Sequence, residues 1–204
     1  MNFNESQTKQ NLAKAFAAEC QAGARYQFMA TQAQTEGLVF VKDTLKMIAK
    51  NEMAHAKLFY DYVLENCGEV CEVNIEADYA YICPALKTSL EEEAQVEEAE
   101  ADSIYPEFAR IAEEEGFSDI AESFRVVAKV EDTHAGILNR INHLYKNKSM
   151  YKRDKKDLFK CSNCGHLAYL AEGWKKCPLC SLPEGYIELS FVDIFKNALG
   201  VSEN

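Results

Sequence analysis

Two short segments, Glu52-Met-Ala-His55 and Glu131-Asp-Thr-His134, decide the fold that this sequence predicts. Each places a carboxylate and an imidazole one helical turn apart, so both side chains point the same way. Together they contain two of the four histidines in the chain. Glu19 precedes the first segment, and Glu97 the second, by nearly the same number of residues. The sequence therefore indicates a twofold repeat of one helical hairpin, with metal ligands in each half.

Ligand pairs of this kind are typical of four-helix bundles that hold two metal ions in their core. The first 147 residues are rich in Ala, Glu, Gln, Lys and Leu with a period near 3.6, which predicts a helical domain over 1–147. Within it, helices are expected at 5–35, 38–66, 84–115 and 118–147. The longer connection between the second and third helices fits a crossover between two hairpins.

In every expected helix, an ionisable residue interrupts the apolar stripe near its middle. In the second helix, for example, Ile48 and Phe59 flank Glu52 and His55 on one face. A buried carboxylate without a partner costs several kcal/mol, and five together could not all remain ionised. Two Fe(II) ions would offset most of that negative charge. Carboxylates with one imidazole per metal suit iron or manganese better than zinc or copper.

The second part of the chain carries a different metal motif. Two Cys-x-x-Cys pairs form a pattern for a tetrahedral four-sulfur site, which iron and zinc both fit: Cys161 with Cys164, and Cys177 with Cys180. We expect a basic linker at 148–157 and a small metal domain at 158–204, ending in a short amphipathic helix near 191–199. A domain of this size requires its metal in order to fold.

Composition limits the classes of function. A net charge of -11 argues against nucleic acid as a partner, because phosphate binding requires a basic face. No long apolar run and no signal peptide is visible, so we expect a cytoplasmic protein that is not inserted in a membrane. With no export signal, the eight cysteines favour metal binding over disulfides. Four of them lie outside any ligand pattern: Cys20, Cys67, Cys71 and Cys83.

The whole chain resembles the rubrerythrin family, in which a ferritin-like di-iron four-helix bundle is followed by a rubredoxin-like four-cysteine domain. The fold expected from this resemblance is mainly α. Beyond the two Glu-x-x-His segments and both cysteine pairs, the resemblance is carried by Lys14-Ala-Phe-Ala-Ala-Glu19, Arg25-Tyr26, Glu97-Glu-Ala-Glu100 and the stretch from Ile104 to Gly116. One departure is His166, which stands where rubredoxins commonly have an aromatic residue.

The resemblance implies a ligand set and an activity. The implied di-iron ligands are Glu19, Glu52, Glu97, Glu100, Glu131 and His134, with Glu52 and Glu131 bridging. In this family one iron exchanges a glutamate for a histidine on reduction, here Glu100 for His55, while Tyr26 and Tyr105 lie beside the site. The implied activity is that of a non-haem di-iron peroxidase, which reduces hydrogen peroxide to water in oxidative-stress defence.

The resemblance also implies partners. Electrons would come from NAD(P)H through redox proteins such as a rubredoxin or a reductase, and then pass through the iron of the four-cysteine site. A homodimer or larger homo-oligomer is expected, because the two kinds of centre must lie close together. The sequence leaves three alternatives open: a ferroxidase or iron-storage protein, a di-iron oxygenase, and a non-catalytic metal-binding protein with zinc in the four-cysteine site.

Overall fold

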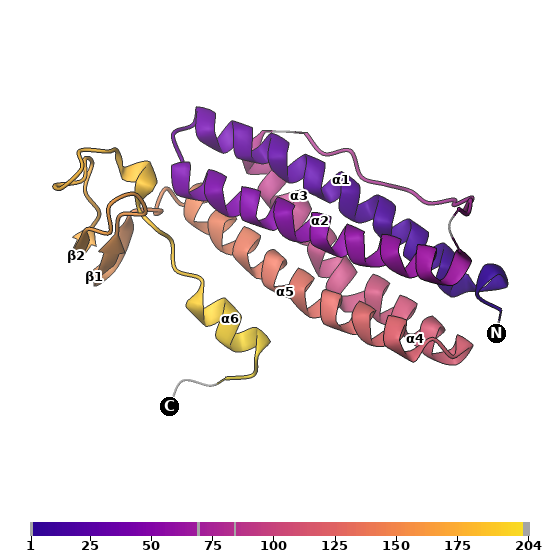
Figure 1. Ribbon diagram of the computed structural model, residues 1–204. Coiled ribbons are helices and arrows are strands. Elements are labelled where there is room, and N and C mark those ends of the chain that lie inside the picture. Colours follow the sequence, from indigo (N-terminus) through magenta and orange to yellow (C-terminus); the bar gives the residue numbers. More distant parts are fainter. Residues whose placement is uncertain (1, 69, 84, 202–204) are drawn as a thin grey trace.

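Four long helical rods form the first domain (Figure 1). The computed structural model describes residues 2–68, 70–83 and 85–201; the expected start of the third helix at 84 and the outer domain limits at 1 and 204 lie outside these residues. The elements of the bundle are η1 (Phe3–Glu5), α1 (Gln7–Thr35), α2 (Val39–Cys67), α3 (Leu86–Ala99), η2 (Glu100–Ile104), α4 (Tyr105–Glu115) and α5 (Ser118–Lys146). The prediction of a mainly helical, ferritin-like bundle is confirmed.

The third rod differs from the single helix expected at 84–115. Between α3 and α4 the five residues of η2 form a π-helical segment, in which the Tyr105 N–H donates to the Glu100 carbonyl. Pro106 follows this segment directly, in the first turn of α4, where its missing N–H leaves no helical hydrogen bond to lose. The wider turn lies at Glu100, one of the predicted ligands, as is common for π-bulges at functional sites.

The start of α1 is tied to the end of α4. The Glu115 carboxylate accepts hydrogen bonds from the backbone N–H groups of Gln7 (2.9 Å) and Thr8 (2.8 Å), which no residue within α1 satisfies. Ser6 is the N-cap residue, and its hydroxyl accepts from the Lys9 N–H at 3.1 Å. One carboxylate from a distant helix therefore holds the amino end of the bundle together.

We expect the Glu115→Ala substitution to lower the free energy of unfolding by about 1–2 kcal/mol, because two backbone donors at the start of α1 lose their acceptor. The matched control is Glu114→Ala, which removes an exposed pair with Arg110 and should cost less than about 0.5 kcal/mol. Urea unfolding followed by circular dichroism measures both changes. Equal effects of the two substitutions would contradict this role for Glu115.

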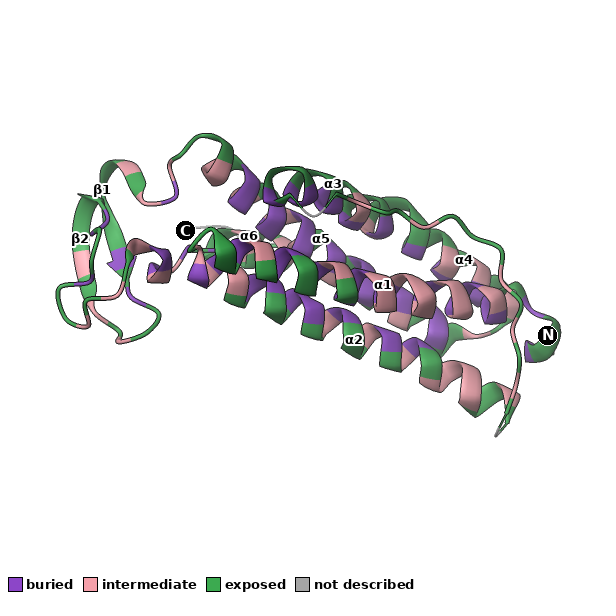
Figure 2. Cartoon of the chain, turned by 90° about the horizontal axis from the view of Figure 1, so that it is seen from above, coloured by how far each residue is buried: buried purple, intermediate pink, exposed green. Residues whose placement is uncertain are grey.

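The bundle core is divided into two apolar clusters. One contains Ala33, Leu45 and Ile141 and lies toward the second domain, whereas the other contains Phe59, Phe124 and further aromatic side chains toward the amino terminus. The polar side chains of the predicted metal site lie between the two clusters. Figure 2 shows the buried faces of the rods turned toward one another along the whole bundle. Among the described residues, no helix is both long and apolar enough to cross a membrane.

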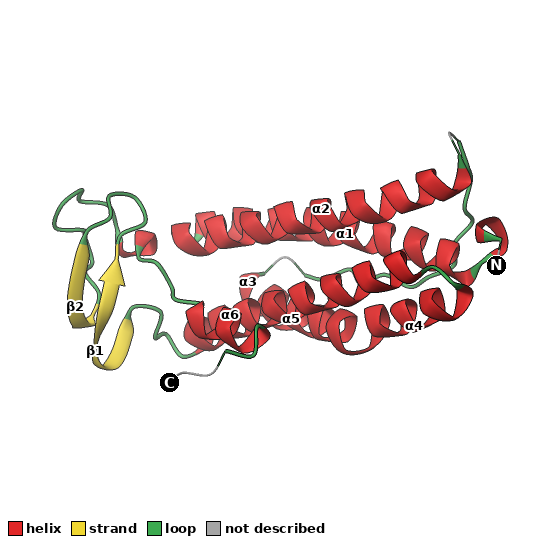
Figure 3. Cartoon of the chain, turned by 60° about the horizontal axis from the view of Figure 1, so that its bottom comes forward, coloured by secondary structure: helices red, strands yellow, loops and turns green. Residues whose placement is uncertain are grey.

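The second domain is built on a two-stranded antiparallel sheet (Figure 3). Strand β1 (Lys152–Lys160) pairs with β2 (Leu167–Glu172), and the register is irregular between Lys152 and Asp157. Part of the segment expected as a linker at 148–157 is therefore strand, because Lys152 and Asp157 pair with residues of β2. The expected small four-cysteine domain after the bundle is confirmed.

The second domain and the tail both contact the bundle. The short helix η3 (Glu184–Tyr186) packs against α2, and Gly185 approaches the Gly37 carbonyl so closely that any side chain at 185 would collide with it. The tail forms α6 (Val192–Ala198), in agreement with the expected amphipathic helix. It packs on α5, where Ile194 covers Gly136.

Candidate metal centres

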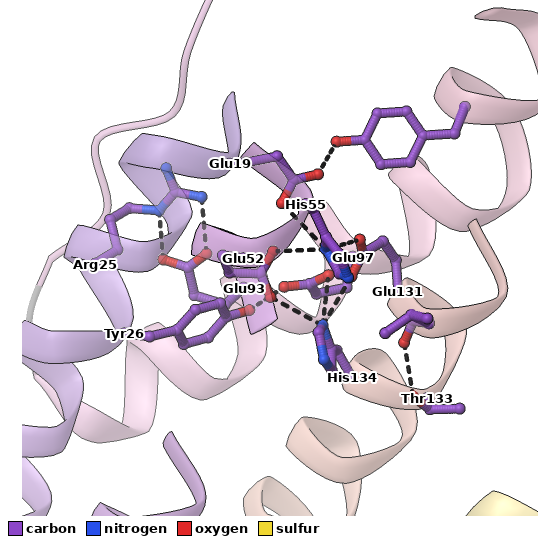
Figure 4. Close-up of polar contacts among 12 residues, drawn as sticks. Glu19, Arg25, Tyr26, Glu52, His55, Glu93, Glu97, Glu131, Thr133 and His134 are labelled. Atoms are coloured by element: carbon purple, nitrogen blue, oxygen red, sulfur yellow. Dashed lines mark hydrogen bonds and ion pairs between the residues drawn. The ribbon is translucent and has the colours of Figure 1, made fainter. Parts of the chain in front are cut away.

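Two groups of side chains in the middle of the bundle are arranged to hold metal ions. The first group is Glu19, Glu52, His55 and Glu131, and the second is Glu52, Glu97, Glu131 and His134; within each, the ligand atoms lie within 4.8 Å of one another. Glu52 and Glu131 belong to both groups, so they are placed to bridge two ions. The close-up in Figure 4 shows these side chains converging from different helices.

The nitrogen and oxygen atoms of the two groups are placed to bind metal ions rather than to form hydrogen bonds with one another. His134 Nδ1 lies 2.7 Å from Glu131 Oε2, and His55 Nδ1 lies 2.9 Å from Glu131 Oε1. Nevertheless, both Nδ1 atoms and both oxygens of Glu52 and of Glu131 are buried without a hydrogen bond among the described residues. Buried polar atoms are normally satisfied, so these atoms indicate a missing partner. Divalent cations would satisfy them and neutralise the carboxylates.

Two buried tyrosines hold the outer carboxylates in place. The Tyr26 hydroxyl donates to Glu97, and the Tyr105 hydroxyl donates to Glu19. Each tyrosine thereby occupies one oxygen of a carboxylate and leaves the other oxygen, Oε2, directed at the centre, with no hydrogen-bond partner in the part of the chain that the structure describes. The sequence predicts both tyrosines beside the site, and hydrogen bonds of this kind fix the orientation of metal-binding side chains.

The four predicted cysteines of the second domain also come together. Cys161 Sγ lies 3.8 Å from Cys180 Sγ, and Cys164 Sγ lies 3.6 Å from Cys177 Sγ. Sulfurs about 2.3 Å from an ion at tetrahedral corners are about 3.8 Å apart, whereas a disulfide needs about 2 Å. The spacing therefore matches a metal site with four cysteine ligands.

Comparison with known proteins identifies the family. The family model described as rubrerythrin matches residues 10–142 and 90–160. The chain belongs to the rubrerythrin family. It is 39% identical over 189 residues to the rubrerythrin of Clostridium perfringens, covering 90% of this chain and 94% of that protein. The rubrerythrin of Porphyromonas gingivalis is 35% identical over 183 residues, covering 90% of each chain.

Solved structures show the same architecture. Nigerythrin in its fully reduced, all-ferrous state matches with a TM-score of 0.58 at 27% identity, covering 92% of this chain and 93% of that one. The match spans both the bundle and the second domain. The family and fold predicted from sequence are therefore confirmed, with a di-iron-type carboxylate and histidine site and a four-cysteine site in one chain of the rubrerythrin family.

Within this rubrerythrin fold, Glu100 and His55 occupy different positions relative to the site. Both are predicted as alternative ligands of one metal, and the structure brings His55, but not Glu100, into the first group. Glu100 lies at the start of η2 and is 7% exposed. Burial, together with the charges of Glu131 and Glu52, raises the pKa of Glu100 to about 8. Its role as an exchangeable ligand stays a prediction.

A buried ion pair lies next to the second group and was not predicted from sequence. Arg25 on α1 donates to both oxygens of Glu93 on α3, with distances of 2.7 Å from Nε and 3.1 Å from Nη2. Glu93 is 1% exposed and lies one helical turn before Glu97, while Arg25 is adjacent to Tyr26. The signal in the sequence was the i, i+4 spacing of Glu93 and Glu97 on one helix face. This pair fixes α1 against α3 beside the centre.

Burial changes the protonation of the site in the absence of metal. It raises the pKa of Glu97 and of Glu19 well above the ordinary value, and neighbouring carboxylates act in the same direction. For His55, burial opposes the charged form, but the carboxylates of Glu131 and Glu19 raise its pKa to about 12. The metal-free site therefore retains protons that metal ions would displace.

The stability of the metal-free protein should fall as the pH rises from about 4.5 to about 8. Over this range the unfolded chain has lost the Glu100 proton, whose ordinary pKa is 4.5, while the folded state still holds it. His55 also lowers the stability as the pH rises, because its pKa is raised from 6.5 to about 12 in the folded state. The stabilisation from its protonated form is fully present below pH 6.5 and is lost toward pH 12. Metal binding instead requires deprotonated ligands, so the metal-loaded protein should gain stability with pH.

Urea unfolding of both forms between pH 5 and 8 tests this prediction. The Glu100→Gln substitution serves as the matched control, because it removes one titrating group and should reduce the pH dependence of the metal-free form. A metal-free protein that became more stable with rising pH would show that the buried carboxyl groups do not retain their protons.

Proposed function

We propose that this protein reduces hydrogen peroxide to water at the carboxylate-rich centre and receives replacement electrons through its four-cysteine centre. The observation that supports this proposal is the combination, in one chain of the rubrerythrin family, of a two-metal site with a four-thiolate site. We propose iron for all three positions. The ligand chemistry favours iron in the bundle, and a related structure is described as all-ferrous nigerythrin.

The chemistry requires two electrons and two protons for each peroxide converted to two water molecules. Two ferrous ions held by the two ligand groups would supply both electrons in one event. The chain's own side chains hold the protons. Tyr26 and Tyr105 each keep a hydroxyl proton on an outer carboxylate, and Glu100, which is buried beside the two ligand groups, would hold a proton whenever it does not bind a metal ion.

Electron return to the centre is proposed to take place between subunits. The four-cysteine domain packs at the Gly37 end of the bundle, and the stretch of α2 from Val39 to Glu52 is about 20 Å long at about 1.5 Å per residue. Because electron transfer slows steeply with distance, we propose a homodimer or larger homo-oligomer that brings a four-cysteine centre closer. Redox proteins linked to NAD(P)H are the proposed donors, and the cytoplasm is the proposed compartment.

Anaerobic stopped-flow mixing of reduced, iron-loaded protein with hydrogen peroxide or dioxygen tests the function. Return of the ferric four-sulfur absorption should be fast with peroxide and slow with dioxygen. An equal or faster reaction with dioxygen would instead favour iron oxidation or oxygenase chemistry. If no such absorption appears in protein produced with iron, the four-cysteine site holds zinc and the proposed relay is wrong.

The Glu100→Ala substitution is expected to slow peroxide turnover by about 100-fold while most of the iron remains bound, because a proton-holding group is lost and His55 completes the first ligand group. The control is Glu92→Ala, an exposed glutamate on the same helical rod. Stopped-flow rates and iron analysis give the two readouts. An unchanged rate would exclude Glu100 from the reaction.

A further inference from the structure

The carboxylate-rich centre is enclosed, so its substrate needs a passage through the bundle. Glu52 and Glu131 are 0% exposed, and Glu19 and Glu97 are each 1% exposed. Glu100 is less deeply buried and lines a cavity of about 290 Å³ that Tyr105 also lines. The cavity therefore reaches two side chains that lie beside the centre, one of which donates a hydrogen bond to Glu19.

The cavity lies between the bundle and the crossover. Its lining comes from α1, from the α3–η2–α4 rod and from residues 77–80 of the connection between α2 and α3. Figure 1 shows this connection running along the outside of α1. Residues 77–80 thus form a strap over the cavity.

The chemistry of the lining suits a small neutral molecule. The walls include small or apolar side chains such as Ala18, Val96 and Phe108, as is usual for small-molecule sites. The charged residues are of both signs, for example Lys14 and Asp78, so the lining presents no uniform field that would attract an anion. A volume of about 290 Å³ holds several molecules of the size of water, at about 30 Å³ each.

Tyr79 fastens the strap to α1. Its ring lines the cavity and is half-buried, and its hydroxyl donates to the Lys14 carbonyl at 3.3 Å. This is a contact between residues far apart in sequence, so it sets the position of the strap over the opening. A smaller side chain at 79 would remove both the ring and the hydrogen bond.

We propose that the cavity under the strap is the passage through which hydrogen peroxide reaches the metal centre, and that Tyr79 determines the width of this passage. The proposal rests on the peroxide reaction proposed above and assigns its route of entry. It predicts that access depends on side chains that bind no metal. The other candidate route passes His55, whose side chain is 12% exposed, on a different helix of the bundle.

The test uses full-length, iron-loaded protein and three variants. Ala18→Leu narrows the cavity, Tyr79→Ala widens it, and Ala24→Leu is the matched control at an exposed position of α1 outside the cavity. Two rates are measured by stopped flow on the reduced protein. The first is the rate of oxidation by hydrogen peroxide or by tert-butyl hydroperoxide. The second is the rate of nitric oxide binding, which is monitored by the absorption of the complex of iron with nitric oxide. Iron analysis shows that each variant retains the centre.

Ala18→Leu should slow both peroxide oxidation and nitric oxide binding by about tenfold, and Ala24→Leu should change neither. Tyr79→Ala should raise the rate with tert-butyl hydroperoxide, relative to hydrogen peroxide, by about tenfold. If the Ala18→Leu variant loses iron, the ratio of the tert-butyl hydroperoxide rate to the hydrogen peroxide rate in Tyr79→Ala tests the proposal by itself. Unchanged rates in both cavity variants would overturn the proposal and favour entry past His55.

Nitric oxide separates this proposal from the proposed function. Rapid nitric oxide binding that Ala18→Leu slows, together with no reaction of the unsubstituted protein with peroxide, would support the passage for small neutral molecules and overturn the peroxidase. Fast peroxide reduction that neither cavity variant changes would support the peroxidase and overturn the passage.

Discussion

Replacing Glu52 with glutamine should remove both metal ions from the bundle and reduce peroxide turnover by at least about 100-fold. Glu52 belongs to both ligand groups, and neither of its oxygens has a hydrogen-bond partner in the described part of the protein. A neutral amide at this position loses the negative charge that both ions require, so the effect exceeds that expected for a ligand of one ion. Iron analysis and stopped-flow oxidation measure the two losses.

The Glu52→Gln substitution should also remove the stabilisation of the folded protein by added metal ions. Ions that bind the folded state raise its melting temperature in proportion to the logarithm of their concentration, and Glu52→Gln should abolish this response to Fe(II) at the bundle. Glu65→Gln, an exposed position on the same helix, serves as the control and should retain it. If Glu52→Gln kept two irons in the bundle, the assignment of Glu52 as a bridging ligand would be wrong.

Replacing Cys177 with serine should unfold the second domain while leaving the bundle helical. Cys177 is 2% exposed, and the domain's apolar cluster is small, with Phe159, Trp174 and Ile187 as its main non-cysteine members. An apolar core of this size is too small to keep the domain folded without the metal. The free energy of metal binding therefore contributes directly to folding. Turnover driven by an external electron donor should fall to background, whereas one oxidation of the chemically reduced bundle should persist.

Trp174 gives a direct measurement of this unfolding, because it is the one tryptophan in the chain and lies in the second domain. Its fluorescence emission should shift to longer wavelength in Cys177→Ser, with little change in far-ultraviolet circular dichroism. Cys83→Ser is the control, since Cys83 is exposed and lies outside the four-cysteine group. An unshifted fluorescence emission in Cys177→Ser would show that the domain folds with only three of its four cysteine ligands.

Several features of the site could be predicted from the sequence because they depend on residue type and local spacing. A glutamate and a histidine three residues apart on a helix must share a face, and the two Cys-x-x-Cys pairs need only a tight turn each to present their thiolates. The left-handed backbone of Gly165, with φ of +74°, forms one such turn after Cys164. Local rules of this kind do not require knowledge of the rest of the fold.

Other features could not be predicted, because they arise from contacts between distant parts of the chain. The Arg25–Glu93 pair joins two helices whose relative rotation the sequence does not specify. The π-helical segment at Glu100 required knowing how the third rod accommodates Pro106. Whether Glu100 or His55 completes the first group depends on distances between helices, which sequence spacing leaves open.

By itself, the sequence therefore determined the two kinds of metal site, the helical hairpin repeat and the family, since ligand chemistry and helical periodicity are local properties. The tertiary structure decided which ligands meet, where the four-cysteine domain docks against Gly37 and how the strap with Tyr79 covers a cavity beside Glu100. Those features depend on the packing of whole helices. Packing joins residues that the chain separates, and no local pattern encodes it.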